Sequence, residues 1–250
     1  MWHQGKQFIP DVRTAQVPGV FRGRPVISTT EVIDFPIDLC PADAIKLNPF
    51  SIDLGRCTFC GECAARYPQK VRFTKDYKMG TNDRSQLIIK ESIANTIVLN
   101  DGDDVTIQVD AQKVRDEIRR LFSGSLKLRQ VSAGGDNSCE LELNASDNVQ
   151  FDVSRFGVEF VASPRHADGI VITGPVTKNM ASALDICYKA IPEPKIIILA
   201  GTDAISGGIF ADSPELDRSF IENHHVDLYL PGNPVHPLTF INGVLNLIRK

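Results

Sequence analysis

The pattern of hydrophobic positions changes character near residue 127. Beyond it, short runs of apolar, often β-branched residues alternate with segments whose apolar residues recur at helical spacing. Strands are predicted at 126–131, 158–161, 169–173, 195–200 and 226–230, and helices at 139–146, 178–190 and 236–248. Continuous apolar runs are typical of strands buried on both faces, so this half predicts an α/β fold with a parallel sheet.

The first half of the chain lacks this alternation. Residues 1–36 are rich in Pro and Gly and predict an extended arm, and residues 37–80 hold clustered cysteines in a small module. Residues 81–126 predict a linker with one helix, and residues 127–250 form the α/β domain. The linker helix would be capped by Asp110, closed by Gly124, and carry apolar side chains at Val114, Ile118, Leu121 and Phe122.

Composition and charge exclude several classes of function. The chain has 250 residues, of which 42% are hydrophobic and 23% charged, as in ordinary globular proteins. A net charge of -4 provides no basic field for phosphates, so nucleic acid is not an expected partner. No secretory signal is visible, and the apolar runs are far shorter than the roughly 20 residues that cross a bilayer. We expect a cytoplasmic protein that reaches a membrane only through partners.

Four of the six cysteines are grouped. Cys57, Cys60 and Cys63 have the C-x2-C-x2-C spacing that wraps three thiolates around an iron-sulfur cube, and Cys40, followed by Pro, supplies the fourth thiolate of the ferredoxin pattern. A tight group in a chain without a secretory signal is more typical of a metal site than of disulfides. The alternative is a zinc ion held by the same four thiolates.

A second cluster of the two-cluster ferredoxin type is not predicted. Its ligand positions would fall near Thr30, Ile33 and Pro36, and at Tyr67 before Pro68. One set of four ligands is therefore complete and its twin is absent. The sequence predicts one 4Fe-4S cluster, bound by Cys40, Cys57, Cys60 and Cys63.

Several separated motifs resemble subunits of redox complexes. The segment DLGRCTFCGEC at 53–63, followed by FTKDY at 73–77, resembles the ferredoxin-like subunit of formate hydrogenlyase and its complex I relatives. The C-terminal half resembles the small subunit of group 4 membrane-bound nickel-iron hydrogenases, which corresponds to the 20 kDa subunit of complex I. The motifs are VASPRHAD at 161–168, TGPVT at 173–177, PK at 194–195, SGGIF at 206–210 and PG at 231–232.

This resemblance implies a second cluster site that the chain does not preserve. In the small-subunit family, four cysteines at the carboxyl edge of the sheet hold a cluster, and here the corresponding residues are Asp136, Cys139, Asp203 and Asn233. An amide and hard oxygen donors suit cluster iron badly, so we expect no cluster there. The pocket is interpreted as a hydrogen-bonded polar pocket, with a hard cation on its oxygens as the alternative.

The remaining candidates have structural interpretations of similar weight. Cys139 is interpreted as a leftover buried thiol and Cys187 as core packing. Arg165 and His166 lie in a loop that the resemblance brings near a partner interface, or they cap a sheet edge. His224 and His225 are predicted on a surface loop and His236 at a helix start. No catalytic triad, H-E-x-x-H or nucleotide fingerprint is present, so no independent catalytic machinery is expected.

Together, residues and resemblance predict a doubly wound, flavodoxin-like domain preceded by a ferredoxin-like module. The expected function is electron transfer and scaffolding in a hydrogenase-related or complex I-like membrane assembly, on the cytoplasmic side. Expected partners are a hydrogenase-large-subunit-like (complex I 49 kDa-like) protein and membrane subunits, with a soluble carrier such as ferredoxin as a further candidate. The alternatives are the small subunit of an active hydrogenase or formate hydrogenlyase, and a zinc-stapled structural adaptor.

Overall fold

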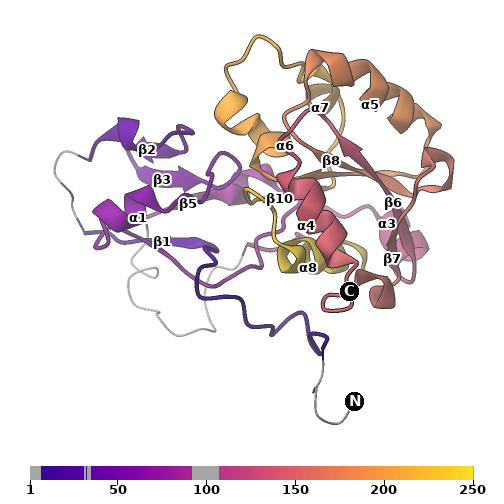
Figure 1. Ribbon diagram of the computed structural model, residues 1–250, viewed down its shortest axis with the longest axis horizontal. Coiled ribbons are helices and arrows are strands. Elements are labelled where there is room, and N and C mark those ends of the chain that lie inside the picture. The colour runs from indigo at the N-terminus through magenta and orange to yellow at the C-terminus, as the bar shows by residue number, and fades with distance from the viewer. Residues whose placement is uncertain (1–6, 31, 33–34, 92–106, 250) are drawn as a thin grey trace.

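The larger part of the molecule is a five-stranded parallel sheet with helices on both faces (Figure 1). The computed structural model describes residues 7–30, 32, 35–91 and 107–249. The strand order is β10-β9-β8-β6-β7, which is the flavodoxin order of doubly wound sheets. The strands are β6 (Leu126–Ser132), β7 (Val158–Phe160), β8 (Gly169–Thr173), β9 (Ile196–Ala200) and β10 (Leu228–Leu230). The predicted α/β, doubly wound fold is confirmed.

Alternating side chains of the strands supply the two faces of the sheet. Ile170 and Ile172 of β8 belong to one hydrophobic core, whereas Val171 between them belongs to the other. One face is covered by α5 (Lys178–Ala190), α6 (Thr202–Ser206) and α7 (Ser219–Asn223), and the other by α3 (Asp116–Phe122), α4 (Ser138–Ser146) and α8 (Pro237–Ile248). Short 3-10 turns complete the domain at Val153–Phe156, Pro164–His166 and Gly208–Phe210. Burial of every strand on both faces explains the continuous apolar runs.

The predicted elements of this domain agree with the structure to within two residues, but the linker helix does not. The sequence predicts a cap at Asp110, whereas α3 begins at Asp116 with Arg115 as its N-cap. The Asp110 carboxylate instead accepts a hydrogen bond from the Gln112 backbone N–H at 2.9 Å. Such an Asx turn competes with helix formation, so the helix starts later than the cap signal indicates.

The small module is built from short antiparallel strands. Its three-stranded sheet has the order β2-β3-β5, and a separate pair joins β1 to β4. Pro25–Ile27 (β1) lies in the predicted arm and Ile88–Lys90 (β5) in the predicted linker, so both segments contribute strands to the module. The other elements are β2 (Ile45–Leu47), β3 (Phe50–Asp53), α1 (Glu62–Arg66), β4 (Val71–Phe73) and 3-10 turns at Ile37–Leu39 and Arg84–Leu87. Parts of the predicted arm and linker lie outside the described residues.

The module and the sheet domain share one hydrophobic core. Ile52 and Leu54 of the module lie in the same buried cluster as Ile172 and Leu199 of the sheet. Thr81 and Tyr229 exchange backbone hydrogen bonds of 3.1 and 2.7 Å, which extends the sheet edge beyond β10. The module is therefore packed against the α5, α6 and α7 face of the sheet domain, as its place in Figure 1 also shows.

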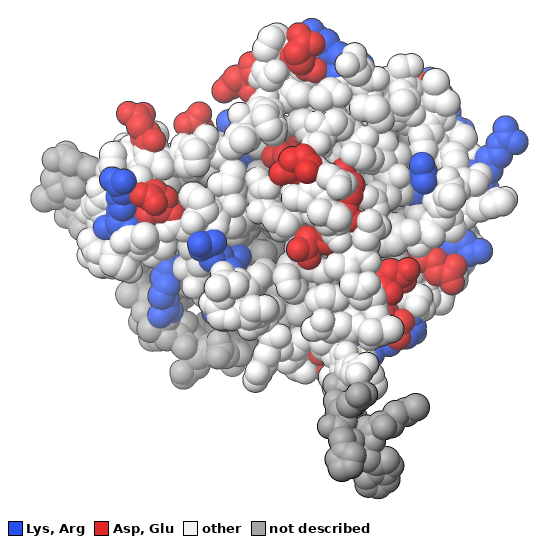
Figure 2. Space-filling model, viewed as in Figure 1, with Lys and Arg blue, Asp and Glu red and all other residues white. Residues whose placement is uncertain are grey.

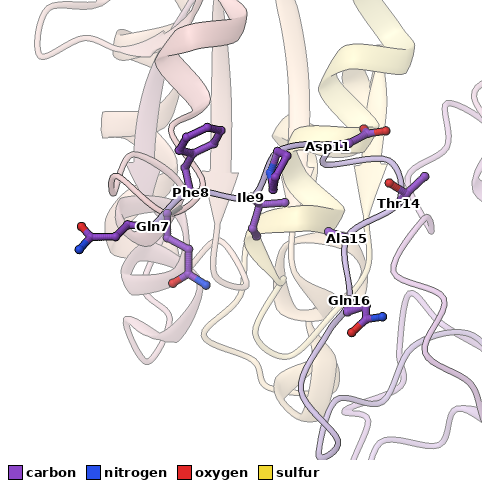
Figure 3. A pocket seen from close by; sticks show the side chains of 9 residues that line it. Gln7, Phe8, Ile9, Asp11, Thr14, Ala15 and Gln16 are labelled. Carbon is purple, nitrogen blue, oxygen red and sulfur yellow. The ribbon is translucent and has the colours of Figure 1, made fainter. Parts of the chain in front are cut away.

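The N-terminal arm runs along the sheet domain. Val12 is 2% exposed, and its carbonyl accepts hydrogen bonds from the Tyr77 hydroxyl at 2.9 Å and the Asn242 amide at 2.7 Å. An open pocket of about 430 Å³ lies along the arm (Figure 3). Its lining comes mainly from residues 7–16 and includes Phe8, Asp11 and Gln150, but none of the six cysteines. The pocket therefore contains none of the predicted metal ligands.

The described surface carries mixed charge. On the face shown in Figure 2, Lys and Arg side chains are scattered among neutral and acidic ones, and no continuous basic patch covers that face. That face offers no extended basic field for a polyanion. In the described parts of the chain, no helix has both the length and the apolar character needed to cross a membrane.

Candidate metal centre

The four grouped cysteines surround one cavity. Cys40, Cys57, Cys60 and Cys63 line it together, although Cys40 comes from a different loop than the other three. The rest of the wall is mostly apolar, with Leu39, Ala44, Ile45, Ile52 and Phe73 among its residues. An apolar wall with four thiols is the environment in which a buried iron-sulfur cluster is held. The role of the four cysteines as ligands stays a prediction.

The loop that carries three of these cysteines is shaped by unusual backbone conformations. Phe59 and Gly61 have φ values of +55° and +82°, in the left-handed region. Because residues 57–61 turn back in this way, Cys57, Cys60 and Cys63 can all face the same cavity. Cys63 lies in the first turn of α1, whose N-cap is Gly61. A non-glycine residue with positive φ is uncommon, and such conformations gather at functional loops.

The loop of Cys40 is fastened to the loop of the other three. Cys40 ends the 3-10 turn Ile37–Leu39, and the Ala44 backbone N–H points at its Sγ at 3.3 Å. The Arg56 guanidinium donates to the Ala42 carbonyl at 3.2 Å and so ties the two loops together. On the other side, the Phe59 N–H donates to Cys57 Sγ at 3.3 Å. Hydrogen bonds from backbone amides to sulfur favour the thiolate, the form that binds iron.

Electrostatics indicate that these thiols need a cation to ionise. Burial raises the pKa of the Cys57 thiol to about 12, and the neighbouring sulfurs of Cys63, Cys40 and Cys60 raise it further. Burial, followed by the charge of Cys60, likewise raises the pKa of Cys63 to about 11. A bound metal deprotonates a coordinating thiol outright, because its positive charge offsets both effects. The donor set therefore fits an iron-sulfur cluster.

The four cysteines span the distance from solvent to the core. Cys60 is exposed, Cys40 and Cys63 are half-buried, and Cys57 is 7% exposed. Within the ranges that the structure describes, no three His, Cys, Asp or Glu side chains are grouped so that they could hold one metal ion. Zinc would require its ligands to converge on one point, whereas each thiolate of a four-iron cluster binds a different iron. The arrangement gives the zinc alternative no support.

The second set of family positions lies at the carboxyl edge of the sheet. Asp136 follows β6, Asp203 follows β9 and Asn233 follows β10, while Cys139 lies in the first turn of α4. Asp136 is exposed and accepts hydrogen bonds from the N–H and hydroxyl of Ser138 at 2.9 and 2.6 Å. These bonds lower the pKa of Asp136. Its oxygens are thus engaged locally rather than aimed at a shared ion.

Cys139 is buried against glycine backbone. A Cβ placed on Gly201, whose φ is +97°, would lie 2.4 Å from Cys139 Sγ, so only glycine fits at that position. Burial raises the pKa of Cys139 to about 12. This agrees with the interpretation of Cys139 as a buried, unreactive thiol. Cys187 is half-buried on α5 and packs against the core, as predicted.

Asp203 is the most perturbed carboxyl group at this edge. Burial raises its pKa to about 6, and the nearby carboxyl groups of Asp136 and Glu140 add to the shift. Its Oδ1 atom is buried and has no hydrogen-bond partner among the described residues. Glu140 is 6% exposed and accepts a 2.7 Å hydrogen bond from the Thr173 hydroxyl, whereas Arg218 binds backbone carbonyls, including that of Asp203.

Replacing Asp203 should therefore stabilise the protein in a pH-dependent way. Its folded pKa lies above the ordinary value, so ionisation costs stability as the pH rises towards about 6. We expect Asp203→Asn to gain about 1 to 2 kcal/mol at pH 7, after allowance for the solvent-exposed part of the side chain, and clearly less at pH 5. Denaturant unfolding at both pH values measures this gain.

A matched control is Asp217→Asn. Asp217 lies at the surface, and hydrogen bonds from Ser219 lower its pKa. Its replacement should give no stabilisation at pH 7. A gain for Asp203→Asn that is the same at pH 5 and pH 7 would contradict the role of ionisation.

The other predicted candidates have clear places. Arg165 and His166 are exposed in the turn between β7 and β8. His225 is exposed as predicted, but His224 is half-buried, stacked on Phe220 with ring centroids 4.3 Å apart. His236 is the N-cap of α8, and its Nδ1 accepts from the Leu238 N–H at 3.1 Å. Burial lowers the pKa of His236 to about 4, so it is neutral, and its helix-start interpretation is confirmed.

Two polar residues near the sites escaped sequence reasoning. Thr202 donates its hydroxyl to the Cys57 carbonyl at 2.9 Å, and Glu140 pairs with Thr173. Neither lies in a metal-ligand spacing, and Thr202 and Cys57 are 145 positions apart. Only the folded chain brings them together.

Comparison with known proteins places the sheet domain. Residues 137–247 match the family described as NADH ubiquinone oxidoreductase, 20 Kd subunit. A probable membrane-bound hydrogenase subunit of Pyrococcus furiosus is 36% identical over 120 residues, which cover 48% of this chain and 72% of that protein. An NADH-quinone oxidoreductase subunit of Citrifermentans bemidjiense is 40% identical over 112 residues, which cover 45% of this chain and 65% of that protein.

Formate hydrogenlyase subunit 7 of Escherichia coli is 34% identical over 139 residues, which cover 56% of this chain and 54% of that protein. The chain thus spans less than two thirds of the Citrifermentans and Escherichia relatives. The match over the sheet domain and the share of the Pyrococcus protein that is covered agree with the observed fold. The chain belongs to the family of the 20 kDa subunit of NADH:ubiquinone oxidoreductase.

Proposed function

We propose that this chain is an electron-transfer and scaffold subunit of a hydrogenase-related or complex I-like membrane assembly, with one 4Fe-4S cluster on Cys40, Cys57, Cys60 and Cys63. The observation that carries the proposal is that these four cysteines line one cavity in a chain of this family. The relatives are a membrane-bound hydrogenase subunit, an NADH-quinone oxidoreductase subunit and a formate hydrogenlyase subunit.

The residues around the cavity have separate tasks in this proposal. When bound, the cluster supplies a one-electron carrier. The four thiolates hold it, and the N–H groups of Ala44 and Phe59 stabilise charge on the sulfurs of Cys40 and Cys57. The apolar side chains of the wall exclude water on the inner side. Exposed Cys60 marks the side on which a donor can approach, and buried Cys57 faces the sheet domain.

The sheet domain serves as a docking scaffold in this proposal. Asp136, Asp203 and Asn233 offer oxygen donors where a cluster would need thiolates, so the residues present do not fit a second cluster. Without that cluster, the chain has no further carrier at the carboxyl edge of its sheet. This departs from a subunit that delivers electrons to a nickel-iron centre.

The proposed partners follow from the relatives. They are a large-subunit-like (complex I 49 kDa-like) protein and the membrane subunits of the same assembly, with a soluble carrier such as ferredoxin as a candidate donor. The proposed location is peripheral, on the cytoplasmic side of the membrane. The names of the hydrogenase and formate hydrogenlyase relatives favour a second candidate, the small subunit of an active enzyme of that kind.

Metal analysis of the assembly purified through a tag on this chain distinguishes the candidates. We expect about four iron and four acid-labile sulfide per copy of this chain, from this chain alone, after dissociation from its partners. A reduced sample should give the paramagnetic signal of one cluster. About eight iron per chain would support the active-enzyme candidate. Zinc without sulfide would contradict both and support the structural adaptor.

A further inference from the structure

A buried hydroxyl group connects the cysteine loop to the sheet domain. Thr202 is the first residue of α6, directly after β9, and it is fully buried. Its Oγ1 lies 2.9 Å from the carbonyl oxygen of Cys57 and 3.1 Å from that of Gly232. Cys57 is the most buried of the four cysteines. The hydroxyl therefore contacts the main chain of the cysteine that lies deepest in the protein.

The two acceptors do not depend on this hydroxyl equally. The Gly232 carbonyl also accepts the Thr202 backbone N–H at 2.9 Å, so it keeps a hydrogen bond without the side chain. The hydroxyl has a single proton, and the Cys57 carbonyl is its nearer acceptor. Loss of the hydroxyl should thus be felt mainly at Cys57.

The surroundings hold this contact in place. A Cβ on Gly55 would come within 2.8 Å of the Ile205 side chain, so the backbone of the cysteine loop lies directly against α6. Ile205, Cys57 and Leu54 belong to the same buried core. Because water is excluded, a dipole at this position acts at low effective dielectric and is felt more strongly than at the surface.

We propose that Thr202 is a positioning residue that raises the reduction potential of the cluster. Its hydroxyl fixes the Cys57 main chain against the sheet edge and offsets the negative end of the Cys57 carbonyl dipole. Reduction adds one negative charge to the cluster, so a donor at this carbonyl stabilises the reduced form. The inference rests on the proposed function, because it assumes that Cys57 binds the cluster.

Redox titration followed by paramagnetic resonance tests this role. In Thr202→Val the shape is kept and the donor is lost, and we expect the equilibrium constant for reduction to fall about two- to tenfold, the effect of one buried hydrogen bond. Thr202→Ser retains the hydroxyl, and its potential should equal that of the unchanged protein. Iron content and melting temperature are measured on each variant.

Ser146→Ala provides a matched control. Ser146 is fully buried in α4 and donates its hydroxyl to the Leu143 carbonyl at 2.6 Å. This variant also loses one buried hydrogen bond to a backbone carbonyl, but in the core on the other face of the sheet. Its potential should not change, even if its melting temperature falls.

The possible results separate the two proposals. An unchanged potential in Thr202→Val with four irons retained would overturn the role of Thr202 and leave the proposed function intact. If Thr202→Val fails to hold the cluster, Thr202→Ala is titrated against Thr202→Ser, and equal potentials would overturn the role in the same way. Absence of iron and sulfide from the unchanged protein would instead overturn the proposed function.

Discussion

Cys60→Ser is expected to reduce the iron content from about four atoms per chain to less than about one and to abolish the paramagnetic signal of the reduced protein. Cys60 is exposed, so its replacement removes a ligand without opening a cavity in the core. The serine hydroxyl is a poor ligand for soft cluster iron. Because the cluster links the Cys40 loop to α1, limited proteolysis should also cut residues 37–80 faster than in the unchanged protein.

Two other cysteines serve as controls for this loss. Cys187→Ser changes a half-buried thiol on α5, and Cys139→Ser changes a buried thiol at the sheet edge. Neither lines the cavity of the four cysteines. Both variants should retain about four irons. Loss of iron in Cys139→Ser would contradict the assignment of the cluster to the small module, and full iron content in Cys60→Ser would contradict the ligand set.

The sheet domain can be predicted well because its signals are local. Each strand is a continuous apolar run, and the predicted segments 169–173 and 178–190 have the bounds that the structure has. The small module cannot be predicted in this way. Its strands β1 and β5 have three residues each, too few to display a period, and their partners are distant in the sequence.

The candidate site divides along the same line. The spacing of Cys57, Cys60 and Cys63 and the Cys-Pro pair at Cys40 are visible in the sequence, and the fold brings all four around one cavity. The contact of Thr202 with Cys57 is not, because a threonine has no special spacing and its partner is a backbone carbonyl. Burial of Cys57 against the sheet domain likewise depends on how the two parts pack.

That packing changes how the small module is understood. A module joined only by a linker would place its metal site at a variable distance from the sheet. Here the shared core and the exchange of hydrogen bonds between Thr81 and Tyr229 fix one part against the other. The four cysteines thus lie near the carboxyl edge of the sheet, through the contact of Cys57 with Thr202. Ligand sites of doubly wound sheets gather at this edge.

Restoring thiolates at this edge should create a second cluster site. The variant Asp136→Cys, Asp203→Cys, Asn233→Cys adds three cysteines to Cys139, at the family's positions after β6, β9 and β10. We expect its iron content to rise from about four to about eight per chain after cluster reconstitution, with a second paramagnetic signal on reduction. The physical reason is that soft iron requires thiolates, and the present oxygen and amide donors do not supply them.

The matched control places serine at the same three positions. It removes the two carboxylates and the amide, as the cysteine variant does, but offers no additional thiolate. Its iron content should stay at about four. If the cysteine variant folds and also stays at about four, the backbone of this edge has lost the shape that a cluster needs, and donor chemistry alone does not explain the missing site. If it rises to about eight, the three substitutions in this chain are sufficient to account for the lost cluster, since Gly201 still leaves room beside Cys139.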